Sequence, residues 1–242
     1  MKKKVLTLCL AAIIAVMAIS GASLAYLKDY DSVKNVMTAG NVKIVQNEKD
    51  RFGADFADDQ RLLPAVYTNL TKDLKYTDAD GTEIMIWGES INNEIDKFVS
   101  VTNRGSEAAY IRTVFAFETR RHYAEGSSTE FTDLHDVYLG VNGTMEYLDL
   151  YITVDGVEYC LAVCTYADPV AAGATTSSSL RQIFLSPDAG NEFYDIFGPT
   201  YEILCLSQAV QVQGFDDART ALDTAFGQIN EANATEWFKA VK

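Results

Sequence analysis

Two histidines, His122 and His135, are the residues in this chain with most potential for catalysis. Neither lies in an H-E-x-x-H zinc helix, beside a cysteine or near a G-x-S-x-G turn, so the usual hydrolase arrangements are missing. The acid pairs Asp58-Asp59 and Asp216-Asp217 could hydrolyse glycosides in principle, which requires two carboxylates roughly 5 to 10 Å apart. Among 34 Asp and Glu residues such pairs carry little information. We therefore expect no enzyme and no catalytic, metal-binding or cofactor-binding residues.

The cysteines do not form the framework of a disulfide-rich protein. Cys9 lies in the apolar N-terminal run, whereas Cys160, Cys164 and Cys205 lie in the body of the chain. Cys160 and Cys164 share one strand-like run, where four residues at about 3.3 Å each put them roughly 13 Å apart, too far for a direct bridge. A bridge from Cys205 to either one requires their strands to be neighbours. We expect buried free thiols that pack as small apolar side chains.

The N-terminus is organised like a secretory signal peptide. Three lysines at positions 2–4 precede an apolar run, Val5–Ile19, and residues 21–25 supply the small side chains that a signal peptidase accepts. An uncleaved membrane anchor is the alternative, but the apolar run is shorter than the ~20 residues that cross a bilayer. We predict cleavage between Ala25 and Tyr26, which leaves a secreted single domain of residues 26–242.

The charge of the cleaved chain restricts its partners. Removal of residues 1–25 leaves 17 Lys and Arg residues against 34 Asp and Glu residues, a net charge of −17. Such a surface repels phosphate backbones and anionic lipid, so we expect no nucleic-acid partner and no membrane association after cleavage. Asn69, Asn142 and Asn233 begin N-x-[ST] glycosylation sequons, a pattern too short to be specific.

Short strand-like runs separated by turn residues fill most of the chain. Residues 76–87 are typical of a hairpin with its turn at 78–81. Residues 98–102 and 109–117 are rich in β-branched and aromatic side chains, and residues 103–106 between them have turn chemistry. Within the second run one alternating face belongs in a core: Ala109, Ile111, Thr113, Phe115 and Phe117.

The second half of the chain continues this pattern. Asn142-Gly143 and Asp155-Gly156 are strong hairpin signals, and the latter predicts that residues 146–154 and 157–166 pair antiparallel. Residues 201–213 alternate like a central strand, and residues 216–226, followed by Gly227, form the best predicted helix. Many short strands with turns every roughly eight to twelve residues indicate a mainly β fold, an antiparallel β-sandwich with a few short peripheral helices.

Several separated segments resemble one family. Residues 21–29 (GASLAYLKD) and 35–44 (NVMTAGNVKI) are similar to the N-terminus of the camelysin/TasA family. Residues 96–112 (DKFVSVTNRGSEAAYIR) resemble the V-x-N-x-G-S-x-x-A-Y-V-R hairpin of its members. Residues 171–176 (AAGATT) and 209–215 (AVQVQGF) are similar to late segments of the family, whereas residues 48–95 match nothing in it.

This resemblance implies a jelly-roll-like sandwich, processing by a SipW-type signal peptidase and export from a Gram-positive bacterium. It also implies a structural role in fibres of the extracellular biofilm matrix or cell surface. The partners would be further copies of the chain, as a homopolymer, and other matrix proteins. Two alternatives stay open: a secreted camelysin-like metalloprotease, against which the missing zinc motif argues, and an adhesive or carbohydrate-binding module.

The resemblance further implies that the N-terminal strand of one subunit completes the sheet of the next. An added strand satisfies otherwise unpaired edge N–H and C=O groups and buries alternate side chains, which gives this route a physical basis. The candidate donor strand is residues 26–46, with apolar positions at Val33, Val36, Val42 and Ile44.

Overall fold

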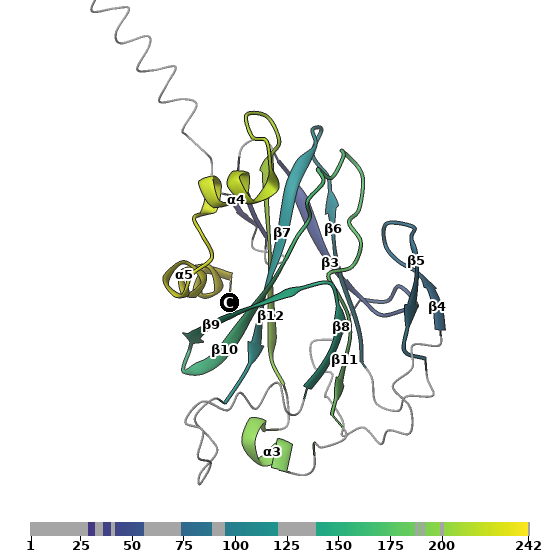
Figure 1. The fold of residues 1–242 in the computed structure, drawn as a ribbon, viewed down its shortest axis with the longest axis vertical. Coiled ribbons are helices and arrows are strands. Elements are labelled where there is room, and N and C mark those ends of the chain that lie inside the picture. Colours follow the sequence, from purple (N-terminus) through teal and green to yellow (C-terminus); the bar gives the residue numbers. More distant parts are fainter. Residues whose placement is uncertain are drawn as a thin grey trace, which may run out of the picture.

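In the computed structural model, two β-sheets pack face to face, with a separate hairpin and short helices outside them (Figure 1). The structure describes residues 29–31, 36–39, 42–55, 74–88, 95–120, 139–186, 189, 192–198 and 201–241. The fold is mainly β with antiparallel sheets and few short helices, as the sequence predicts.

The strands divide into a six-stranded sheet, a four-stranded sheet and a hairpin. In spatial order the first sheet consists of β1 (Asp29–Asp31), β2 (Val36–Ala39), β12 (Ile203–Gln211), β7 (Ala109–Glu118), β10 (Val157–Thr165) and β9 (Glu146–Val154). The second consists of β3 (Ile44–Lys49), β6 (Ile95–Asn103), β11 (Leu180–Leu185) and β8 (Leu139–Gly143). The hairpin is formed by β4 (Leu74–Thr77) and β5 (Glu83–Ile86), and the helices are α3 (Glu192–Phe197), α4 (Ala218–Phe226) and α5 (Glu231–Val241).

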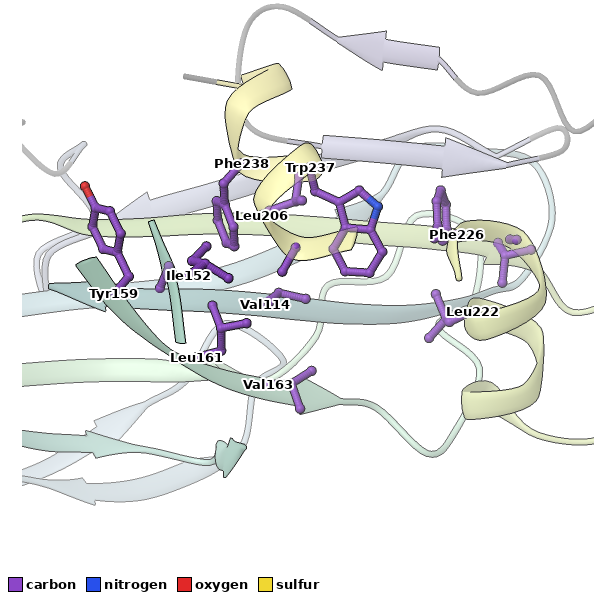
Figure 2. Close-up of a cluster of buried hydrophobic side chains, with 14 of the residues drawn as sticks. Val114, Ile152, Tyr159, Leu161, Val163, Leu206, Leu222, Phe226, Trp237 and Phe238 are labelled. Atoms are coloured by element: carbon purple, nitrogen blue, oxygen red, sulfur yellow. The ribbon is translucent and has the colours of Figure 1, made fainter. Parts of the chain in front are cut away.

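Strand β7 is buried on both faces, all along its ten residues. Its inner face, with Phe115 and Phe117, packs between the sheets as the sequence predicts. Its outer face is covered by α4 and α5, which lie over the side of the six-stranded sheet away from the four-stranded sheet (Figure 1). Figure 2 shows this outer cluster, which includes Val114, Ile152, Leu161, Leu206, Leu222, Phe226, Trp237 and Phe238.

Helix α4 confirms the helix predicted in this region. Asp217 caps its N-terminus, since its carboxylate accepts the N–H of Thr220 at 2.8 Å, and Gly227, at φ +90°, ends it. Helix α5 has no counterpart among the sequence predictions. Its residues Ala234, Trp237 and Phe238 complete the outer cluster.

The outer face of the four-stranded sheet carries the β4–β5 hairpin. Tyr76 stacks on Phe98 and Trp87 meets Phe184 edge to face, each with ring centroids 4.5 Å apart. Asp78, at the start of the hairpin turn, is buried against the chain entering β11, where it accepts the N–H and the hydroxyl of Ser178 at 3.0 and 2.5 Å. The predicted hairpin therefore forms and is fixed to the sandwich by a buried carboxylate.

Two predicted local turns turn out to be crossings between the sheets. Residues 104–108 lead from β6 in one sheet to β7 in the other, so the two strands are not paired as a hairpin. Asn142 and Gly143 end β8, which pairs with β11, and the chain then enters β9 in the opposite sheet. In both places the turn residues reverse the chain, but burial of both strands between layers decides which partner each one takes. Asp155-Gly156, in contrast, forms the predicted hairpin turn between β9 and β10.

Candidate assembly edge

The N-terminal strands form one lateral edge of the six-stranded sheet. β2 runs parallel to β12, with Val36 opposite Ser207 and Ala39 opposite Val210, and β1 pairs antiparallel with β2. All other strand pairs among the described residues are antiparallel. A parallel pair cannot be closed by a tight turn. The ladder itself therefore holds β2 at this edge.

Strand β2 covers only part of β12. β12 has nine residues, and β2 pairs with Ser207–Val210. On the side away from β7, no described strand pairs with residues 203–206. That stretch of backbone is where a longer or additional strand would find peptide groups to pair with.

After β2 the chain passes to the four-stranded sheet. The carbonyl of Lys43 accepts the N–H of Arg104 at 2.7 Å, and β3 then pairs with β6 along its whole length. Val42 and Ile44 pack in an interior cluster whose other members include Val101, Ala109, Ile111 and Ala209. Strand β3 is thus a part of the core.

The residues predicted to form the donor strand are distributed over two sheets. Val33 lies outside the described residues, and Val36 opens β2 at the edge of the six-stranded sheet. Val42 lies in the crossing connection and Ile44 begins β3 in the four-stranded sheet. The donor strand stays a prediction, and its last positions, Val42 and Ile44, belong to the interior cluster.

The opposite edge of the six-stranded sheet is shaped differently. Edge strand β9 loses register with β10 between the pairs Cys160–Tyr151 and Ala162–Tyr147, and Asp149 in the irregular stretch has a positive φ of 50°. Asp149 and Glu146 are exposed there, while α5 packs against β9. Bulges and charges are devices that prevent an edge from pairing with another chain. The β2–β12 edge is therefore the better candidate for strand addition.

Titratable groups gather at the end of β7 but are fully engaged with one another. Arg120 donates to Glu118 at 2.6 Å, and Tyr159 donates to Glu202, whose own N–H donates to Glu118 at 3.2 Å. Burial raises the pKa of Glu118 above its ordinary value, while the N–H of Glu202 and Arg120 oppose the shift. Burial also raises the pKa of Tyr159, with Glu202 adding to it. We interpret this cluster as an internal hydrogen-bond network.

Other predicted sites are either buried or outside the described residues. Cys160, Cys164 and Cys205 are buried thiols, as predicted, and β7 separates the strands of Cys160 and Cys205. Asn142 is 2% exposed and its amide donates to Gln182 at 3.0 Å, so this sequon is not accessible for glycosylation. The signal cleavage site at Ala25 and Tyr26, and both histidines, lie outside the described residues.

The described part of the chain contains neither a cluster of metal ligands nor a membrane-spanning helix. Within it, no three His, Cys, Asp or Glu side chains gather closely enough to hold a metal ion. No helix among the described residues has the length and apolar character needed to cross a membrane.

Comparisons with protein-family models, with curated proteins and with solved structures returned no match to this chain. The assignment of a function therefore rests on the chain itself. The sequence marks the N-terminal segment but does not indicate β12 as its neighbour, because strand order within a sheet leaves no signal in the alternation of side chains. The only hint was the alternation of residues 201–213 on both faces, which indicated a central strand.

Proposed function

We propose that the chain is a secreted structural subunit of extracellular or cell-surface fibres, such as those of a biofilm matrix, that assembles by adding its N-terminal strand to the next subunit. The observation that carries the proposal is the position of β2 beside β12 in the six-stranded sheet. A four-residue parallel ladder holds it beside β12, and the remaining edge of β12 has no described strand partner.

Strand exchange conserves the interactions that β2 makes. The backbone hydrogen bonds between β2 and β12 are the same whether β2 belongs to the same chain or to a neighbour, so exchange loses few contacts. Because the β2–β12 pair is parallel and not closed by a tight turn, the domain can present β12 to a second chain. The bulged and charged β9 edge opposes pairing on the other side, which favours linear growth in one direction.

The test compares two forms of the cleaved protein by electron microscopy and light scattering. Residues 26–242 should form filaments, whereas residues 41–242, which retain β3 and its buried Ile44, should fold and stay monomeric. This deletion is more informative than removal of residues 26–46, which would also take Ile44 and Gln46 out of the core. Filaments in equal yield from residues 41–242 would refute strand addition.

A proline pair gives a matched control for the edge. In a strand with neighbours on both sides, successive N–H groups point to opposite neighbours. Among Met37→Pro and Thr38→Pro, one variant therefore removes a hydrogen bond to β12 and the other a bond to β1. One of the two should reduce filament yield more strongly than the other, and equal full yield from both would contradict the proposed role of β2.

A further inference from the structure

A chain of polar side chains crosses the interior between the two sheets. On β3, Gln46 is 1% exposed and Glu48 follows it on the same face of the strand. On β6, Lys97 is 5% exposed, and its Nζ contacts the Oε2 atom of Glu48. On β12, facing them, Ser207 is fully buried. Buried groups of this kind need partners, and here they supply partners to one another.

One carboxylate holds an amine and a carboxamide at the same time. Oε2 of Glu48 accepts from Nζ of Lys97, and Oε1 of Glu48 accepts from Nε2 of Gln46 at 2.9 Å. The carbonyl of the same Gln46 side chain is bound from the other sheet, since Oγ of Ser207 donates to Oε1 of Gln46 at 2.6 Å. Thr113 lies 3.0 Å from Ser207 and can donate to its hydroxyl in turn.

The amine, the carboxylate, the carboxamide and the hydroxyl of Ser207 are the groups that an amide-exchange reaction requires. A lysine amine is a nucleophile once it has lost its proton, and a carboxylate in contact with it is a base for that proton. A carboxamide carbon is the electrophile, and a hydroxyl on the carbonyl oxygen stabilises the negative charge that develops there. Burial of the amine, the carboxamide and the hydroxyl holds these groups together and limits competing water, while the side chain of Glu48 is 25% exposed.

We propose that Lys97 and Gln46 form an intramolecular isopeptide bond between β6 and β3, with Glu48 as the proton shuttle and Ser207 as the donor to the carbonyl oxygen. Nζ of Lys97 gives a proton to Glu48 and attacks Cδ of Gln46, one bond from Nε2. The Cδ–Nε2 bond then breaks as Glu48 delivers that proton to the leaving nitrogen. Glu48 next takes the second proton from Nζ and passes it to the ammonia, which departs as ammonium. The product is a secondary amide, and no oxidant or reductant is required.

The bond would fix β3, the strand that follows the N-terminal strands β1 and β2 in the chain. β3 is the edge strand of the four-stranded sheet and follows directly after the connection from β2. A covalent link from β3 to β6 would transmit a pull on β1 and β2 into the body of the sandwich. The bond itself is independent of filament formation, so its presence or absence can be measured without reference to the proposed function.

The test is a tryptic map of the intact protein, read by mass spectrometry under reducing and denaturing conditions. Trypsin does not cleave after an acylated lysine, so the linked product joins residues 44–49 to residues 76–104. Its mass should equal the sum of the two peptides less one ammonia, and fragmentation should place the loss on Gln46 and Lys97. Free peptides 44–49 and 98–104 in full yield from the wild-type chain would overturn the proposal.

Two variants and a control assign the roles. Lys97→Arg keeps a cation beside Glu48 but removes the amine, and should give no linked peptide. Glu48→Gln keeps the shape but removes the base, and should reduce the linked fraction at least tenfold. Lys49→Arg alters a neighbouring lysine that pairs with Asp55 at 2.6 Å on the surface, and should leave the link unchanged. An ammonia loss that persists in Lys97→Arg, or a water loss located at Glu48, would overturn it.

Discussion

Replacing Arg112 with methionine should remove the main polar tie between the six-stranded sheet and its helices. From the outer face of β7, Nε donates to Gln208 at 2.6 Å, Nη1 to Asp223 at 2.7 Å and Nη2 to the carbonyl of Gly227 at 3.0 Å. The guanidinium also lies 5.4 Å from the ring centroid of Trp237 on α5. One side chain therefore reaches both the C-terminal end of α4 and the face of α5.

The expected loss follows from burial. The side chain of Arg112 is 2% exposed and that of Asp223 is 25% exposed. Breaking a buried ion pair by removing one partner costs about 3–5 kcal/mol. Because Asp223 retains some contact with water, we expect about 3 kcal/mol for Arg112→Met, at the lower end of that range. This is a large part of the ~5–15 kcal/mol that stabilises a typical domain.

Urea unfolding of residues 26–242, followed by circular dichroism, provides the measurement. The matched control is Arg219→Met on α4, whose side chain is 74% exposed and 3.8 Å from Glu146, and which should change the free energy of unfolding by less than about 0.5 kcal/mol. Asp223→Asn combined with Arg112→Met should cost less than the sum of the single variants. A cost of Arg112→Met below about 1 kcal/mol, or strict additivity, would refute the reasoning.

Three further predictions follow from other buried groups. Glu118→Gln should gain stability relative to wild type as pH rises from about 4 to 7 in urea titrations. Burial raises the pKa of Glu118 in the folded protein, so the free energy of unfolding of the wild type falls as pH rises from the pKa of Glu118 in the unfolded chain to its pKa in the folded one. A difference between the two proteins that does not change with pH would contradict this. Asp78→Ala should increase hydrogen exchange throughout β4 and β5 and cost about 3 kcal/mol, whereas Asp80→Ala at the exposed tip of the same turn should cost less than about 1 kcal/mol. A thiol reagent should label none of Cys160, Cys164 and Cys205 in native residues 26–242 and all three in urea, since burial shields them and raises the pKa of Cys164 and Cys205; rapid native labelling would show that the sandwich opens.

Local signals predicted many of the elements well. The β4–β5 hairpin, the β9–β10 pair, β12 and α4 all lie where turn residues and periodicity placed them. The buried cysteines also agree with prediction, because thiols that pack as small apolar side chains are favoured in a core. These features depend on interactions between residues close in sequence or on simple burial.

Features that depend on partners distant in sequence could not be predicted. The turn at residues 104–108 has hairpin chemistry, yet β6 and β7 join different sheets. Arg112 alternates with the residues assigned to the core, on the opposite face of the same run, and only the position of α4 and α5 makes it a buried anchor. The order of strands that seats β2 beside β12 likewise has no local signature.

The sequence by itself determined the class of fold, the positions of most strands, the acidic surface and the lack of a recognisable catalytic motif. It did so because alternation, turn chemistry and charge are properties of short segments. Tertiary structure alone decided which strands are neighbours. The two features on which the proposals rest both depend on that arrangement. The ladder at the β2–β12 edge joins residues about 170 positions apart, and the cluster of Gln46, Glu48, Lys97 and Ser207 is assembled from three strands. Only packing of the two layers brings such residues into contact.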